Sequence, residues 1–413
     1  MRGARPLAGA AVKFLLENSL FLLGGALAGL LWANFGHDTY EALRHLPLFE
    51  NRLFGTPHGD HRIIDLHFLV NDVLMALFFA IAGKEVWEAT LPGGPLNSPR
   101  QAATPLLATL GGVVAPAGLY LAGAAALGQM AEVGRGWAIP CATDIAFSYM
   151  VARLVFGSLH PAIPFLLLLA IADDAIGLVI LAIFYPQEQV RPLYLLLAVG
   201  AVGLGFLFRR LRWHSFWPYL LIAGSISWAG FALAGLHPAL GLLPIIPTLP
   251  HAHVDTGLFD WGRLERHDTL SAFEHWWKNP VELILGAFGL LNAGVLLSAV
   301  DTPTYLVLGG LLLGKPLGIW GLGMLAARGM GFGLPGGMKP RELLVVGFAA
   351  AIGFTVALFV ATVAFPPGAT QDAAKMGALA SFGAAALTWG LGKLLRVEKR
   401  TAASSSTGFE SRG

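Results

Sequence analysis

The chain has 413 residues, of which 55% are hydrophobic and only 13% are charged, and its mean hydropathy is +0.66. A soluble globular domain has about 25% charged residues, so this composition excludes an ordinary soluble protein and indicates a polytopic membrane protein. The formal net charge of +2 says little about partners, and the single cysteine, Cys141, excludes an intrachain disulfide framework.

Charge-free stretches locate the membrane-spanning elements. They cover residues 101–131, 192–208, 213–254, 343–371 and 376–392. Each is near or above the roughly 20 residues that a transmembrane helix needs. The strands of a transmembrane barrel would alternate in polarity over about ten residues, and the sequence does not have this pattern. We therefore predict an all-α polytopic membrane protein.

Charged, proline-rich and glycine-rich breaks divide the chain into about twelve predicted helices. Their approximate bounds are 13–34, 66–90, 103–128, 137–155, 161–185, 191–211, 216–235, 237–250, 279–300, 304–328, 340–365 and 372–396. The predicted regions are a cytoplasmic N-terminus (1–12), a membrane domain (13–396) and a disordered cytoplasmic tail (397–413) rich in Ser and Gly near its end. Lys and Arg are concentrated in the loops on one side, so both termini are expected to face the cytoplasm.

Residues 35–65 form the longest outward loop. Gly55-Thr56-Pro57 and His58-Gly59-Asp60 suit a turn or a hairpin. We expect this loop either to contact a second subunit or to be a mobile exposed segment.

Ionisable residues inside the predicted helices are the strongest pointer to function, because each costs at least about 2.5–3.5 kcal/mol to insert and so needs a partner or a role. They are Asp72, Lys84, Glu85 and Glu88 in the second helix, Asp144 in the fourth, Asp173 and Asp174 in the fifth, Glu282 in the ninth and Lys315 in the tenth.

Asp173 and Asp174 interrupt a long apolar run near its middle, and Lys315 is the obvious cationic partner. Two carboxylates close together in a low dielectric do not both stay ionised readily, so the pair is expected to bind protons near physiological pH. Deprotonated, and with an oxygen neighbour such as Thr143, the pair suits a hard cation such as Na+. Competition between proton and cation would then give two protons per Na+ and electrogenic exchange. A buried ion pair that only locks helices together is the alternative reading of Asp173 with Lys315.

Thr143 and Asp144 follow Ile139-Pro140 and a glycine-rich stretch, so the fourth helix is expected to be interrupted there. Such breaks expose backbone carbonyls and helix termini, and they are tolerated at membrane depth only where they line a cavity. Asp144 would neutralise positive helix N-termini, while Lys315 would balance negative C-termini. Gly347 and Gly353-Phe354-Thr355 offer a matching weak point in the eleventh helix.

Six ordered motifs resemble the NhaA family of Na+/H+ antiporters over roughly residues 13–396. They are Gly136-Trp137-Ala138-Ile139-Pro140 with Ala142-Thr143-Asp144-Ile145-Ala146-Phe147, Ala170-Ile171-Ala172-Asp173-Asp174, Asn71-Asp72 with Leu74-Met75-Ala76, Gly314-Lys315-Pro316-Leu317-Gly318-Ile319, Asn292-Ala293-Gly294, and Ile352-Gly353-Phe354-Thr355.

The resemblance implies twelve helices with inverted repeats, at about 103–185 and 304–396, and two interrupted helices, the fourth and the eleventh, that cross near mid-membrane. It implies Na+ (and Li+) exchange for protons at Asp173 and Asp174, pairing of Lys315 with Asp173, and a place for Asp72 on the ion pathway. It further implies a homodimer in the bacterial inner membrane with its contact at the 35–65 loop. No cofactor, nucleotide or nucleic acid is expected.

The resemblance also implies activation at alkaline pH, with Glu85, Glu274 and His275 in the pH-sensing cluster. The segment Gly83-Lys84-Glu85-Val86-Trp87-Glu88 departs from the family because Trp87 and Glu88 stand where basic residues are usual. This change bears on the pH profile rather than on exchange itself.

Two other classes of function compete with antiport. A sodium-coupled symporter for an organic solute would have a polar or aromatic substrate cavity, whereas the polar residues here gather around two carboxylates and a lysine. An intramembrane aspartyl protease would carry a Gly-x-Gly-Asp string, which the sequence lacks. A nucleotide-binding P-loop is also absent from the sequence, which argues against an ATP-driven pump.

Overall fold

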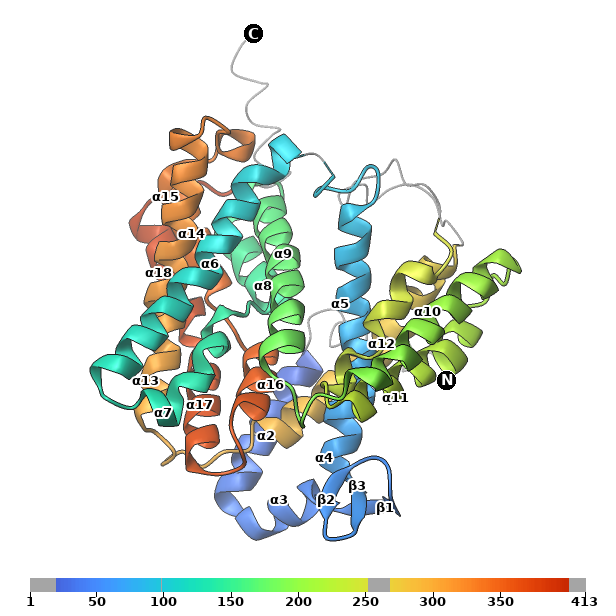
Figure 1. Cartoon of the computed structure of the whole chain (residues 1–413). Coiled ribbons are helices and arrows are strands. Elements are labelled where there is room, and N and C mark those ends of the chain that lie inside the picture. The colour runs from blue at the N-terminus through green and yellow to red at the C-terminus, as the bar shows by residue number, and fades with distance from the viewer. Residues whose placement is uncertain (1–19, 98, 252–267, 401–413) are drawn as a thin grey trace, which may run out of the picture. The chain divides into compact units, whose positions relative to one another are not determined.

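A computed structural model describes residues 20–97, 99–251 and 268–400 (Figure 1). The predicted N-terminal region 1–12, the start of the first predicted helix and residues 401–413 lie outside these ranges. The chain divides into two compact units, each assembled from segments that are far apart in the sequence. Among the described residues, unit 1 comprises 20–92, 178–251 and 268–297, and unit 2 comprises 93–97, 99–177 and 298–400.

Unit 1 combines helices with a small sheet. Its α-helices are α2 (Leu20–Phe35), α3 (His37–Arg44), α4 (Leu66–Phe68), α5 (Met75–Thr90), α10 (Leu195–Arg210), α11 (Ser225–Ala234) and α12 (Thr269–Asn292). Its π-helical turns are η1 (Leu69–Leu74) and η4 (Tyr219–Gly224), and its 3-10 helices are η3 (Pro192–Tyr194), η5 (Pro238–Leu240) and η6 (Leu243–Thr248). Its strands are β1 (Pro47–Asn51), β2 (Thr56–His58) and β3 (His61–Asp65).

Helices α2 and α12 pack with their backbones in close contact. A Cβ atom on Gly25 would lie 2.0 Å from the carbonyl oxygen of Gly286. Small residues allow this approach, and in membrane helices it replaces the hydrophobic driving force that operates in water.

The loop predicted over residues 35–65 folds as a short helix and a sheet, which lie at one end of unit 1 beyond α4 (Figure 1). The strand order is β1-β3-β2 and both pairings are antiparallel, with Phe49 opposite Ile64 and His58 opposite His61. The β2–β3 hairpin matches the turn predicted around His58-Gly59-Asp60.

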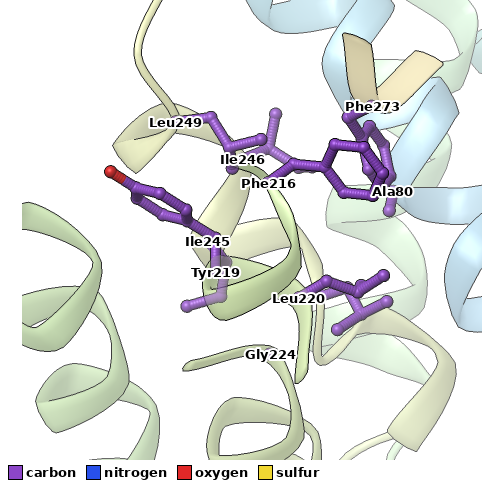
Figure 2. A pocket seen from close by; sticks show the side chains of 10 residues that line it. Ala80, Phe216, Tyr219, Leu220, Gly224, Ile245, Ile246, Leu249 and Phe273 are labelled. Carbon is purple, nitrogen blue, oxygen red and sulfur yellow. The ribbon is translucent and has the colours of Figure 1, made fainter. Parts of the chain in front are cut away.

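Unit 1 also has a small, partly open apolar pocket of about 10 Å³, between α5, η4, η6 and α12. Figure 2 shows Phe216, Ile246 and Phe273 around it, whereas Tyr219 turns its hydroxyl away from the others. That hydroxyl donates a hydrogen bond to the carbonyl of Trp213 at 3.2 Å. The lining therefore presents hydrocarbon.

Unit 2 is helical throughout its described part. Its α-helices are α6 (Pro99–Ala126), α7 (Met130–Val133), α8 (Ile145–Phe156), α9 (Ala162–Phe184, to Gly177), α13 (Thr302–Gly309), α14 (Lys315–Met324), α15 (Pro340–Ala350), α16 (Thr355–Ala364), α17 (Ala369–Ala380) and α18 (Gly383–Leu394). Its 3-10 helices are η2 (Gly134–Cys141) and η9 (Pro335–Gly337), and its π-helical turns are η7 (Gly310–Gly314) and η8 (Leu325–Gly329).

The core of unit 2 joins the two halves of its sequence. Helices α6 and α14 meet at Gly111 and Gly318, where a Cβ on either residue would lie 2.0 Å from the other's carbonyl oxygen. Helices α8, α15 and α18 are in contact. Buried side chains of α8, α9 and α15 form one apolar cluster that includes Phe156, Leu166 and Val346, and Leu391 of α18 packs against it. Packing between distant segments thus determines the shape of this unit.

Among the described residues, five helices are long and apolar enough to cross a membrane, or seven if each of two bent helix pairs counts as one span. The protein is therefore mostly helical with several apolar spans, as predicted.

Three predicted helices differ clearly from the structure. The helix expected over 372–396 is two helices, α17 and α18, with a turn at Ser381 and Phe382 between them. The helix expected over 279–300 is α12, which begins ten residues earlier because it continues through Pro280. The helix expected over 237–250 is two 3-10 helices, because Pro238, Pro244 and Pro247 each lack a backbone N–H donor.

Candidate functional site

Two bent helix pairs meet within unit 2. Helix η2 ends at Cys141 and α8 begins at Ile145, with a bend of 53° between them. Helix α15 ends at Ala350 and α16 begins at Thr355, also with a bend of 53°. The sequence predicted interruptions at both places. Each break leaves unpaired backbone groups that need partners.

Asp144 satisfies the N-termini of two helices at once. One carboxylate oxygen accepts from the backbone N–H of Phe147 in α8 at 3.3 Å. The other accepts from the backbone N–H of Thr355 in α16 at 3.2 Å and from the Thr355 hydroxyl. The two breaks are also joined directly, since the Asp144 N–H donates to the carbonyl of Ile352 at 2.8 Å. One negative charge therefore lies at two positive helix ends.

Lys315 supplies the opposite charge. It is fully buried, and its Nζ atom lies 2.8 Å from Oδ2 of Asp173, which is 3% exposed. Nζ also donates to the carbonyl of Cys141, the last residue of η2. The lysine thus joins the carboxylate of α9 to a negative helix C-terminus. The π-helical turn η7 ends immediately before it, and such turns occur frequently at functional sites.

Thr143 and Asp174 complete the predicted ion site. The buried Thr143 hydroxyl donates to the carbonyl of Ala350 at 3.0 Å, which leaves its oxygen lone pairs available as an acceptor. Asp174 follows Asp173 in α9 and is only half-buried. Successive residues of a helix point about 100° apart, so the side chains of Asp173 and Asp174 leave α9 in different directions.

Asp72 belongs to a polar cluster in unit 1. It lies in the π-helical turn η1, and its carbonyl accepts from Nε1 of Trp228 at 2.7 Å. Its carboxylate is 3.7 Å from Nδ1 of His237. The neighbouring Asn71 exchanges two side-chain hydrogen bonds, of 3.0 and 2.8 Å, with Asn292 of α12.

The predicted pH-sensing residues surround a buried lysine. Lys84 of α5 is 4% exposed and forms ion pairs with Glu88, at 2.6 Å, and with Glu274 of α12. Glu85 is half-buried on α5, and His275 is exposed on α12. Sequence reasoning noted the charge of Lys84 but assigned it no role, and it did not assign Thr355 to the site. The available signal for Lys84 was a lysine inside a predicted membrane helix, next to Glu85 and four residues before Glu88.

The family model described as Na+/H+ antiporter 1 matches residues 13–391. The chain belongs to this family. The Na(+)/H(+) antiporter NhaA of Jannaschia sp. strain CCS1 is 54% identical over 416 residues, which cover 94% of this chain and 98% of that protein. The protein of the same name from Desulfitobacterium hafniense is 48% identical over 391 residues, with 94% and 97% covered.

The solved structure of the sodium proton antiporter MjNhaP1 from Methanocaldococcus jannaschii is 15% identical, with a TM-score of 0.49 and 93% of each chain covered. At this level of similarity it says nothing about the residues of the site. Membership of the family confirms the resemblance noted in the sequence and the prediction of a transporter rather than an enzyme.

Proposed function

We propose that this member of the Na+/H+ antiporter family exchanges Na+, and also Li+, for protons at Asp173 and Asp174. The observation that carries the proposal is the contact of Asp173 with the buried Lys315 beside the paired helix breaks. A cation entering the site meets the Asp173 carboxylate, one oxygen of which already contacts the Lys315 ammonium group. Metal binding and proton binding at these oxygens therefore exclude one another.

Each transport cycle follows from this competition. With both carboxylates protonated the site carries no Na+, and with both deprotonated it holds one Na+, aided by the Thr143 oxygen. Two protons then move for each Na+, and the exchange is electrogenic. Access alternates between the two sides of the membrane, and Asp72 lies on the ion pathway.

The fold proposed for this mechanism has twelve transmembrane helices, of which the fourth and eleventh are interrupted and cross near mid-membrane. The inverted repeats cover about 103–185 and 304–396. Their element order supports this, since each repeat has a continuous span, a broken pair and a further helical segment in that order. We place the protein in the bacterial inner membrane with both termini in the cytoplasm, in accord with the distribution of Lys and Arg.

Regulation by pH is proposed for the Lys84 cluster. Lys84 pairs with Glu88 within α5 and with Glu274 of α12, so a proton on Glu274 would weaken the link between the two helices. Replacing Glu85 or Glu274 with glutamine is expected to move the activity–pH curve. Unmoved curves for both variants would refute the assignment of this cluster as the pH sensor.

A homodimer contact is proposed at residues 35–65. The side chains of Leu48, Phe49 and Leu53 are 48%, 64% and 61% exposed on and beside the sheet, which favours a protein partner over water. Phe49→Asp is expected to convert a dimer to a monomer in detergent, as measured by light scattering. A monomeric wild type would refute this contact.

The test of exchange is Na+-induced proton movement in proteoliposomes between pH 6.5 and 9. Wild type is expected to collapse a preset pH gradient when Na+ is added, while Asp174→Asn and Asp173→Asn are expected not to. Glu132→Gln, which alters an exposed carboxylate in α7, is the matched control. Uptake of an organic anion with Na+, without proton movement, would favour the symporter instead.

A further inference from the structure

The chain after α18 turns back onto unit 2 instead of leaving it. Arg396 adopts a left-handed conformation with φ of 51°, and the Val397 N–H donates to the carbonyl of Gly392 at 2.9 Å. These features end the helix and redirect the backbone. Residues Val397–Arg400, which we call the C-terminal strap, then follow.

The strap pairs with the connection between α8 and α9. The N–H of Arg400 donates to the carbonyl of Phe156 at 2.9 Å, and the carbonyl of Arg400 accepts from the N–H of Leu159 at 3.1 Å. Gly157 lies between them with φ of +82°, and a Cβ there would be 2.6 Å from the Arg400 carbonyl oxygen. The two backbones are therefore too close for any side chain at position 157.

The strap also reaches α15. Glu398 lies 3.4 Å from Nζ of Lys339, the residue that precedes α15. The side chains of Leu395 and Val397 pack against the apolar cluster formed by α8, α9 and α15. A terminal segment of only four residues thus contacts the ends of two helices that the sequence separates by almost two hundred positions.

Beneath the strap, a buried polar contact joins the same elements. His160 is 1% exposed, and its Nδ1 accepts from the N–H of Ala162 at 3.1 Å. Its Nε2 lies 3.7 Å from Oε2 of Glu342, and the same oxygen accepts from the N–H of Lys339 at 2.8 Å. His160 therefore links the start of α9 to the start of α15. The charged groups around it are Glu342 and Lys339 of α15 and Glu398 and Arg400 of the strap.

The opposite ends of α8 and α15 lie at the two helix breaks. Helix α8 begins next to Asp144, and α15 ends next to the carbonyls of Ala350 and Ile352 that accept from Thr143 and Asp144. At 1.5 Å per residue, the twelve residues of α8 place the strap about 18 Å from the break. Helices are stiff over this distance, so displacement of one end shifts the other.

We propose that the C-terminal strap is a positioning element, which holds the outer ends of α8 and α15 together and thereby keeps the paired helix breaks aligned for Na+ binding. This proposal rests on the proposed function for its second part. Its first part states that the strap holds the ends of the two helices together. This part concerns the fold alone, and hydrogen exchange tests it independently of transport.

The experiment compares three chains: the full chain, a chain that ends at Arg400 and a chain that ends at Arg396. Loss of the strap is expected to accelerate amide hydrogen exchange at Leu159 at least tenfold and to raise the KM for Na+ several-fold. The chain that ends at Arg400 lacks the same final residues but keeps the strap, so it is expected to match the full chain in both measurements.

A point variant covers the case in which the shortest chain does not fold. Arg400→Pro removes the N–H that bonds to Phe156, whereas Arg400→Ala keeps it. Only the proline variant is expected to lose protection at Leu159 and to raise the KM.

Each outcome is decisive. Unchanged hydrogen exchange in the strap-less chain or in Arg400→Pro would overturn the fastening. Faster exchange with unchanged KM and kcat would overturn the positioning role while leaving the contact intact. If the full chain moves no protons in response to Na+, the proposed function fails, and hydrogen exchange still decides whether the strap fastens the helix ends.

Discussion

The contact between Asp173 and Lys315 yields the sharpest prediction. Lys315→Met removes the ammonium and leaves a carboxylate that is 3% exposed, together with the Cys141 carbonyl, without this partner. Breaking a buried ion pair by removing one partner costs about 3–5 kcal/mol. An unfolding entropy of about 2.1 cal/mol/K per residue gives about 0.9 kcal/mol/K for the whole chain, so the midpoint falls by roughly 3–6 °C.

A double variant tests whether the two side chains stabilise each other or act independently. Asp173→Asn combined with Lys315→Met removes both charges, so its cost is expected to be at least about 2 kcal/mol less than the sum of the single costs. Thermal unfolding in detergent at pH 8.5 measures all three variants. Lys278→Met, which changes an exposed lysine of α12, is the control and is expected to leave the midpoint unchanged.

Additive single effects would contradict this reasoning, because they would mean that the two groups do not stabilise each other. A midpoint for Lys315→Met equal to that of wild type would contradict it as well. Either result would leave the lysine as a structural neighbour and not as the partner of the carboxylate.

Three further predictions concern other parts of the molecule. Asn71→Ala is expected to lower the free energy of unfolding by about 1–3 kcal/mol, because the buried amide of Asn292 loses the two hydrogen bonds that it forms with the Asn71 side chain. The double variant Asn71→Ala with Asn292→Ala is expected to lose less than the two single variants added together. Burial has the largest effect on the pKa of His160 and lowers it, although the negative charge of Glu342 raises it in part. The unfolded chain then binds more protons than the folded chain below about pH 6.5, so stability falls as the pH drops through that value, by at most about 1.4 kcal/mol per pH unit. His160→Asn is expected to flatten the midpoint–pH curve from pH 7 to 5, whereas His214→Asn is expected to leave its slope intact. Phe273→Ala enlarges a pocket that already exists, so unfolding in detergent should show a loss of about 3–5 kcal/mol, and a loss below 1 kcal/mol would mean that the walls collapse.

Apolar runs, charge and local breaks were enough to predict much of unit 2. The carboxylates of α9 and the lysine of α14 could be identified because the surrounding residues are apolar. Opposite charges in apolar surroundings are expected to pair, because an unpaired charge there is costly. The interruption before Asp144 was visible from Pro140 and the preceding glycines. The start of α12 was predicted wrongly because Pro280 looks like a helix start, whereas neighbouring helices can stabilise a helix that continues through proline.

The strap and the His160 contact could not be predicted from the sequence. The strap is held by backbone hydrogen bonds between residues 156–159 and 400, and any residue other than proline can supply them. Composition indicated a disordered tail over 397–413, and the four residues of it that the structure describes pack against unit 2. A histidine next to a proline in a predicted loop gives no sign that it is buried against a glutamate.

The order of synthesis adds a consequence to the ion pair of unit 2. Asp173 precedes Lys315 by 142 positions, and ribosomes add about 5–20 residues per second, so the lysine emerges roughly 7–28 s after the aspartate. During that interval the nascent helix carries Asp173 without Lys315. Helix α9 is therefore inserted before Lys315 is available, with protons or water in place of the lysine. The insertion of α14 then supplies the ammonium group that stabilises the buried carboxylate.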